Sequence, residues 1–149
     1  MRLARLMAPG LGVLLLALPA RAAGQEAPIG RWLTEDGKAV IAIEPCGASL
    51  CGRIVGIALS HPSNPIPTDH TGRTQCGLTI IRDAVPDGTE WRAEIVDPRD
   101  GSVYRARMNL DGQRRLRVRG YIVIPLLGRT QVWTPFARTL PESCRMAPP

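Results

Sequence analysis

The chain has 149 residues, 44% of them hydrophobic, and its 19 basic and 13 acidic side chains give a net charge of +6. This composition is that of a globular protein and excludes a repeat or low-complexity architecture.

The first 22 residues have the order of a secretory signal peptide. Basic residues in Met1–Arg5 precede the apolar run Leu11–Leu18, and Ala20-x-Ala22 follows as the cleavage signal. The apolar run is too short for a membrane span. Cleavage after Ala22 would leave 127 of the 149 residues as one domain, 23–149, and would lower the net charge to +3 by removing three arginines. We therefore expect a periplasmic or secreted protein without a membrane span, a compartment that argues against nucleic acid as a partner.

Strand patterns cover most of the remaining chain. Pro45 is expected to end the second strand, and Pro86-Asp87-Gly88 to turn the chain after the fourth. Residues 60–75 form a loop rich in proline and glycine, and a loop this long in a compact domain is usually functional or mobile. The tail 141–149 is expected to be frayed apart from Cys144. The strands expected outside the central segment are Ile29–Thr34, Lys38–Glu44, Gly52–Leu59, Gly77–Asp83 and Arg129–Phe136.

The segment from Trp91 to Ile122 is expected to form a three-stranded meander, because apolar residues occupy every second position in three successive segments that are joined by two turns. Opposed residues must share a face, so we predict Ile95 opposite Tyr104 and Met108 opposite Leu116. The second pairing leaves the three-residue loop 111–113 and places Gly120 opposite Tyr104, where the missing side chain would make room for the ring.

Eight antiparallel strands with short connections predict an all-β, eight-stranded up-and-down barrel, or failing that a sandwich. Such a barrel has room for its own side chains or for one small ligand. The large inward residues that would line a ligand pocket are Trp32, Trp91, Tyr104 and Met108. The full predicted inward set of the second strand and the meander is Ile41, Ile43, Trp91, Ala93, Ile95, Tyr104, Ala106, Met108, Leu116 and Val118.

The outer face of the meander is expected to gather six arginines with only Glu94 among them. Two interpretations are open: the guanidinium groups are the solvated side of the sheet, or they bind an anionic envelope component through their forked donors. The six are Arg92, Arg105, Arg107, Arg115, Arg117 and Arg119.

Four cysteines in an exported chain predict two disulfides. We favour Cys46 with Cys51, which flank a short turn, and Cys76 with Cys144, which would tie the tail to the barrel. The alternative is a metal or redox centre, but zinc sites prefer matched, closely spaced pairs.

No catalytic constellation or cofactor motif is evident, so the protein is more readily a binding protein than an enzyme. The two histidines, His61 and His70, lie in the long loop with Asp69. These three side chains could hold a metal, although solvated loop histidines are the commoner case, so no metal is assigned.

An ordered set of motifs resembles a family of small exported bacterial proteins known only as a domain of unknown function with a lipocalin-like fold. In lipocalin-like barrels an arginine on the last strand commonly packs on the first-strand tryptophan, but Pro135 stands where family members often have arginine. The resemblance leaves Arg129 or Arg138 as substitutes. A second departure is Ile122-Val123-Ile124, where a glycine is frequent. The motifs are Gly30-x-Trp32, Leu50-Cys51-Gly52-Arg53-Ile54, Cys76-Gly77-Leu78, Trp91, Asp97-Pro98 with Gly101 and Tyr104, Arg119-Gly120-Tyr121, and Leu127-Gly128 with Trp133.

The resulting expectation is an exported, lipocalin-like barrel that binds a small apolar or amphipathic ligand at a mouth beside loop 60–75. The alternative is an envelope interaction protein that uses the outer arginines on an acidic surface or partner.

Overall fold

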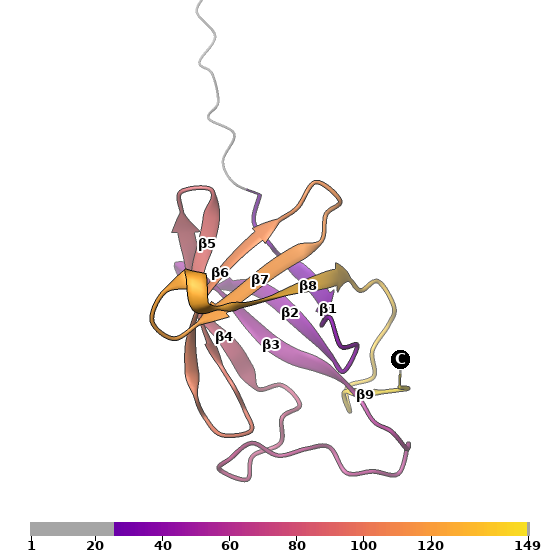
Figure 1. Ribbon diagram of the computed structural model, residues 1–149. Helices are drawn as coiled ribbons and strands as arrows, with labels where there is room; N and C mark the ends of the chain where they lie inside the picture. The colour runs from indigo at the N-terminus through magenta and orange to yellow at the C-terminus, as the bar shows by residue number, and fades with distance from the viewer. Residues whose placement is uncertain (1–25, 149) are drawn as a thin grey trace, which may run out of the picture.

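The computed structural model describes residues 26–148, so the predicted signal peptide lies outside the described residues. The chain forms a barrel of antiparallel strands with a short strand at the C-terminus (Figure 1). The elements are β1 (Gly30–Leu33), β2 (Ala39–Cys46), β3 (Ser49–Ala58), β4 (Thr79–Asp87), β5 (Glu90–Val96), β6 (Val103–Leu110), β7 (Leu116–Tyr121), the 3-10 helix η1 (Pro125–Leu127), β8 (Arg129–Pro135) and β9 (Arg145–Met146).

Strands β1 to β8 pair in chain order, and β1 also pairs with β8, which closes the sheet. This confirms the predicted eight-stranded up-and-down barrel rather than a sandwich. Within residues 26–148 no helix has the length and apolar character needed to cross a membrane. We call one end of the barrel the closed end; it carries the N-terminal segment and turns 47–48, 88–89 and 111–115. We call the other the open end; it carries turns 34–38, 59–78, 97–102 and 122–128.

The alternation of apolar residues correctly predicted the two faces of the sheet. Ile41, Met108 and Leu116 are at most 1% exposed inside the barrel, and the rest of the predicted inward set is buried or half-buried. The half-buried members are Ile95 and Tyr104, which lie opposite each other near the open end. The core is therefore packed more densely in the closed half of the barrel than in the open half.

The register of the meander is correct for one pair of strands and wrong for the other. Ile95 lies opposite Tyr104 as predicted, but Met108 lies opposite Val118, two residues beyond the predicted Leu116. Gly120 accordingly faces Ala106 rather than Tyr104. The loop spans five residues because the Asp111 carboxylate accepts the backbone N–H groups of residues 113 and 115. A shift of two keeps every side chain on its predicted face.

Two strands extend beyond their predicted ends at the closed end of the barrel. Strand β2 continues through Pro45 to Cys46, with Pro45 opposite Leu50. Proline is tolerated there because β1 pairs only as far as Ile43, which leaves that edge of β2 free. Strand β4 includes Pro86 and Asp87, so its hairpin turn is residues 88–89. Strand β2 thus ends two residues beyond its predicted end, Glu44, and β4 ends four residues beyond its predicted end, Asp83.

In the described part of the tail, residues 141–148, the chain forms the short strand β9 against the barrel. The C-terminal half of β3 extends toward the open end beyond its pairing with β4. Strand β9 pairs in parallel with that part of β3, so that Ile57 lies opposite Arg145. The backbone N–H of Ile57 donates to the Cys144 carbonyl at 2.7 Å. Gly56 leaves space on the outer face, since a Cβ there would overlap the Met146 sulfur. The tail thus covers an edge that β4 leaves open.

The closed end is sealed by residues 26–28. The Trp32 indole N–H donates to the carbonyl of Pro28 at 2.9 Å, and the Trp91 indole donates to the carbonyl of Glu26 at 3.3 Å. Neither predicted substitute arginine packs on Trp32: Arg138 lies over Phe136, 5.1 Å from the ring centroid, and Arg129 pairs opposite Gly120 at the open end. Backbone carbonyls of the N-terminal segment therefore satisfy the indoles that end this part of the core.

Candidate functional site

The open end of the barrel contains a cup made of two adjoining hollows of about 400 Å³ and about 460 Å³. Volumes of this size are typical of small-molecule sites. Residues of the seven strands β2 to β8 form its wall, and the turns 34–38 and 97–102 form part of its rim. The two hollows share the lining residues Ile95, Asp97, Arg99, Tyr104, Gln131 and Trp133.

The cup includes one position where the sheet carries no side chain. Gly120 of β7 lines the cup, and a Cβ there would meet only the Tyr104 Cβ, 4.0 Å away, so the space beside this glycine is open. Its neighbours across the sheet, Ala106 on β6 and Ala93 on β5, are buried in the core. In the next row toward the closed end, Val118 lines the cup. The missing side chain at Gly120 therefore leaves room in the cup.

The cup combines apolar walls with a few fixed polar groups. The Trp133 indole N–H donates to the Gln131 side-chain oxygen at 2.7 Å, which fixes both side chains. At the rim, Arg99 donates to both carboxylate oxygens of Asp97, and this hydrogen bonding lowers the pKa of the Asp97 carboxyl. Such a site suits a ligand with an apolar body and a polar group at the mouth.

Of the four predicted pocket residues, the structure places Tyr104 in the cup wall. Trp91 and Met108 lie in the filled half below it, and Trp32 borders a smaller hollow of about 250 Å³ at the closed end. Sequence reasoning missed Gln131 and Arg99. A signal for Gln131 was available, because a polar residue in an inward position of β8 two places before Trp133 interrupts the apolar alternation.

Loop 59–78 borders the open end and is held by one buried carboxylate. Asp69 has a side chain only 1% exposed and accepts hydrogen bonds from the N–H and hydroxyl of Thr71 and from the N–H and guanidinium of Arg73. These donors, the Thr71 hydroxyl first, hold the pKa of Asp69 well below its ordinary value. The loop also donates the His70 N–H to the Pro98 carbonyl at 2.9 Å, which ties it to turn 97–102.

The predicted candidate metal residues are not brought together. His61 contacts Ser63 through its Nδ1 at 2.7 Å, and His70 lies against Gly101, while Asp69 is fully engaged with Thr71 and Arg73. Among residues 26–148, no three His, Cys, Asp or Glu side chains are grouped as metal ligands.

The outer arginine face is more neutralised than the sequence suggested. Arg107 pairs with Glu90 at 3.3 Å and with Asp87 at 3.5 Å, and Arg115 pairs with Asp111 at 2.8 Å. The expectation that only Glu94 lies among the arginines was therefore wrong, because β4, the start of β5 and turn 111–115 supply further carboxylates. Arg92 lies 3.8 Å from Asp87, and Arg119 donates to Thr130 and to the Leu126 carbonyl.

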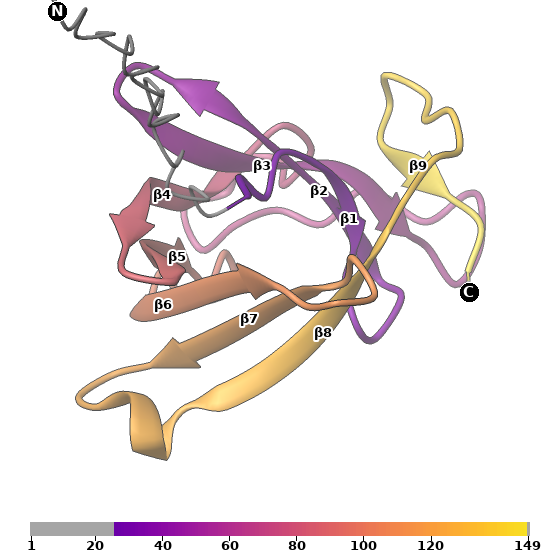
Figure 2. The same cartoon turned by 90° about the horizontal axis from the view of Figure 1, so that it is seen from above.

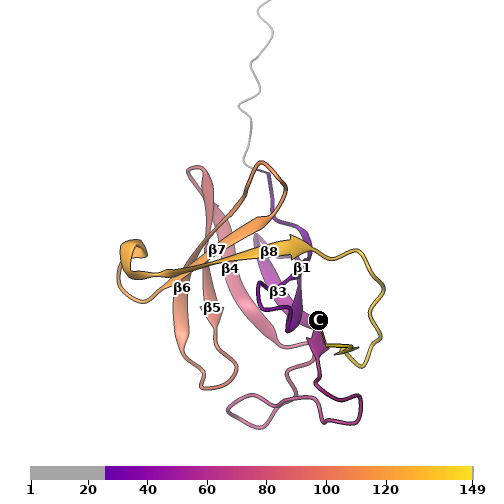
Figure 3. The same ribbon diagram turned by 45° about the vertical axis from the view of Figure 1, so that its right-hand side comes forward.

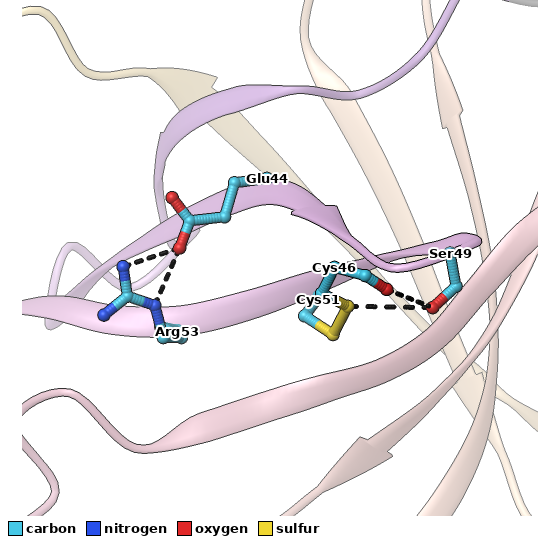
Figure 4. The surroundings of a disulfide bond; sticks show 5 residues. All are labelled: Glu44, Cys46, Ser49, Cys51 and Arg53. Atoms are coloured by element: carbon cyan, nitrogen blue, oxygen red, sulfur yellow. Dashed lines mark hydrogen bonds and ion pairs between the residues drawn. A yellow bond between two sulfur atoms is a disulfide. The ribbon is translucent and has the colours of Figure 1, made fainter.

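Both predicted disulfides are present, one at each end of the barrel. Cys46–Cys51 joins β2 to β3 beside turn 47–48, where Figure 4 shows it next to Ser49 and the Glu44–Arg53 ion pair. Cys76–Cys144 joins loop 59–78 to the tail. The second disulfide also lines a hollow of about 430 Å³ on the outer face, between the tail and strands β2 and β3. Charged groups, including the Glu44–Arg53 pair, border that hollow, in contrast to the apolar cup.

The comparisons with known proteins agree with this architecture. No match is found among curated proteins. A solved structure, "Protein HP1028 from the human pathogen Helicobacter pylori belongs to the lipocalin family", superposes with a TM-score of 0.61 at 12% sequence identity, covering 79% of this chain and 95% of that chain. At this identity the likeness shows the fold alone, and that fold is lipocalin-like.

A family model described as "Uncharacterized protein conserved in bacteria (DUF2147)" matches residues 30–135, which run from the first residue of β1 to the last residue of β8. The match covers the whole barrel and agrees with the resemblance of the ordered motifs. The chain therefore belongs to this bacterial DUF2147 family, and its barrel is lipocalin-like.

Proposed function

We propose that the protein binds a small apolar or amphipathic ligand in the cup at the open end of the barrel. The observation that carries the proposal is the pair of adjoining hollows at the open end, which share the apolar wall residues Ile95, Tyr104 and Trp133. The apolar part of the ligand would lie against Tyr104 and Trp133, with its polar end toward Gln131 and Arg99.

The predicted compartment is consistent with this function. The two disulfides suit an oxidising environment, and we infer a periplasmic or secreted protein that carries or captures its ligand outside the cytoplasm. The predicted pocket residues are revised in the proposal: Tyr104 contacts the ligand, whereas Trp91 and Met108 support the floor of the cup from below.

The test fills the cup from within. Gly120→Leu adds a side chain to open space at a residue whose φ is not in the left-handed region, and it should reduce uptake of a fluorescent apolar probe such as N-phenyl-1-naphthylamine at least tenfold. The matched control is Gly112→Leu, which also adds a side chain to open space, but in the turn at the closed end.

Native mass spectrometry of protein purified from its own host identifies a copurifying ligand directly. Equal probe uptake by Gly120→Leu, Gly112→Leu and the unchanged protein would place binding elsewhere and overturn the proposal. Unchanged thermal stability of both variants is required for the comparison, because a misfolded barrel also loses the cup.

The outer arginine face supports a second, weaker candidate function, binding of an acidic surface. It rests on Arg117, an exposed side chain of β7 opposite Asn109 and Val132, for which the described residues provide no carboxylate partner. Charge reversal at this residue should remove salt-sensitive retention on anionic vesicles if the outer face is the binding surface.

A further inference from the structure

The connection between β7 and β8 exposes a run of large apolar side chains. Ile122 and Val123 are 70% and 71% exposed, and Leu126 and Leu127 are 81% and 80% exposed, with Ile124 at 44%. Single exposed apolar residues are normal on a protein surface, but five within six consecutive residues form a patch that marks an interaction site. We call residues 122–127 the apolar loop.

The apolar loop is anchored in this exposed arrangement. The Arg119 guanidinium donates to the Leu126 carbonyl at 3.0 Å and to the Thr130 hydroxyl at 2.7 Å, and the Leu127 N–H donates to the Ile124 carbonyl at 3.2 Å. Gly128 fits closely at the base, since a Cβ there would lie 3.0 Å from that of Tyr121. These contacts fix the backbone and leave the leucine side chains pointing away from the core.

The loop projects from the body of the barrel. Figures 2 and 3 show that the backbone of η1 and its flanking residues projects beyond the ends of the neighbouring strands. A projecting tip of branched side chains can enter a soft apolar phase, whereas most protein partners require a broad complementary surface.

The charges around the loop favour an anionic partner. Residues 122–128 contain no acidic side chain, and Arg129 follows them directly. Arg119 anchors the loop from the outer face, and the exposed Arg105 lies opposite Tyr121, the residue before the loop. Basic groups that surround an inserted apolar segment add attraction to acidic lipid head groups.

We propose that the apolar loop docks the protein on the surface of a bilayer that contains anionic lipids, with Leu126 and Leu127 inserted among the acyl chains and Arg105 and Arg129 at the head groups. The loop lies at the open end, so docking turns the mouth of the cup toward the membrane. The docking is independent of whether the cup holds a ligand.

Vesicle flotation of the purified protein tests the docking, using phosphatidylcholine vesicles with and without phosphatidylglycerol. The unchanged protein should float with the anionic vesicles, and less so at high salt. The double variant Leu126→Ser with Leu127→Ser should bind at least about tenfold more weakly, because two apolar side chains no longer leave water. Arg129→Gln should weaken binding about fivefold.

Two matched controls separate the loop from other surfaces. Ile29→Ser removes an apolar side chain that is 51% exposed at the closed end, and Arg114→Gln removes an exposed arginine from turn 111–115, also at the closed end. Both should float like the unchanged protein.

Three results would overturn the inference. One is absence of flotation of the unchanged protein. Another is equal flotation of the double serine variant. The third is a greater loss in Arg117→Gln than in Arg129→Gln, which would assign the binding to the outer arginine face. A concentration-dependent dimer that the double serine variant abolishes, without vesicle binding, would instead make a second copy the occupant. None of these results depends on probe uptake by the cup.

Discussion

The two ends of the barrel are built from the same alternating strands, yet one is filled and the other is hollow. At the closed end, Trp91 and Met108 fill one row and Trp32 donates its indole N–H to Pro28. At the open end, Gly120 and the half-buried Ile95 and Tyr104 line the cup. Alternation therefore decides which side chains face inward, whereas the size of the residues in each row decides whether the interior is a core or a site.

The largest expected difference between the two ends comes from their disulfides. Replacing both Cys76 and Cys144 by serine should lower the free energy of unfolding by about 4 kcal/mol, because this bridge closes a loop with a sequence separation of 68. The corresponding change at Cys46 and Cys51, with a separation of 5, should cost about 2 kcal/mol. Urea unfolding of the two double variants measures both values.

Equal losses from the two double variants would contradict this order. They would indicate that the stabilisation does not depend on the length of the chain segment that a disulfide closes. The Cys76–Cys144 disulfide would then stabilise the protein no more than Cys46–Cys51 does. A change in the denaturant slope, rather than the midpoint, would indicate an altered unfolded state and would require a separate reference for each variant.

Truncation of one side chain in each half should show the difference in packing. Met108→Ala removes a fully buried side chain from the filled half and should lower the free energy of unfolding by about 3 kcal/mol through lost contacts and an unfilled cavity. Tyr104→Ala removes a half-buried side chain from the cup wall, where solvent can enter, and should cost about 1 kcal/mol.

Probe uptake should show the opposite order. Tyr104→Ala should weaken binding of the probe in the cup more than Met108→Ala does, when each variant is measured at a temperature well below its melting temperature. Equal stability losses for the two variants would show that the open half is packed as densely as the closed half, which would remove the structural basis of the proposed site.

The sequence predicted the faces and most strand positions because these depend on local patterns. It predicted both disulfides because Cys46 and Cys51 flank a short turn and Cys76 and Cys144 are then the remaining pair. The two-residue error in the β6–β7 register has a local cause that was not visible in the pattern. Arg114 adopts a positive φ of 57°, which usually favours glycine, and the Asp111 carboxylate compensates by accepting backbone N–H groups. The sequence pattern does not show that the Asp111 carboxylate stabilises a turn in which Arg114 takes the place of the usual glycine.

Long-range details were harder to predict for a different reason. Strand β9 has two residues, too short for any periodicity, and its pairing with β3 depends on how far β4 covers that strand. The surroundings of Gly120 required the true register, which places this glycine beside Ala106 rather than Tyr104. The predicted inward set contained the right residue types, but their rows could be identified only from the three-dimensional structure.

The smallest predicted effect concerns the pH dependence of one turn at each end. Asp69 at the open end and Asp111 at the closed end both accept backbone N–H groups, and both carboxyls have lowered pKa values. A carboxyl with a depressed folded pKa contributes stability above its unfolded pKa, near the ordinary aspartate value of 3.8, and that contribution is lost as the pH falls toward the folded pKa.

Asp69→Asn should increase hydrogen exchange at the Thr71 and Arg73 amides near neutral pH, because both amides donate to the carboxylate. The difference in the exchange rates of these amides between Asp69→Asn and the unchanged protein, measured at equal pH, should become smaller as the pH falls below the ordinary aspartate pKa of 3.8. Asp111→Asn should show a smaller change, since the Asp111 side chain is 16% exposed against 1% for Asp69. Asp100→Asn, which removes a carboxylate that accepts the Ser102 N–H, serves as the control. Because Asp69 holds the loop that borders the cup, a pH-independent difference at its amides would show that hydrogen-bond geometry rather than the charge orders the open end.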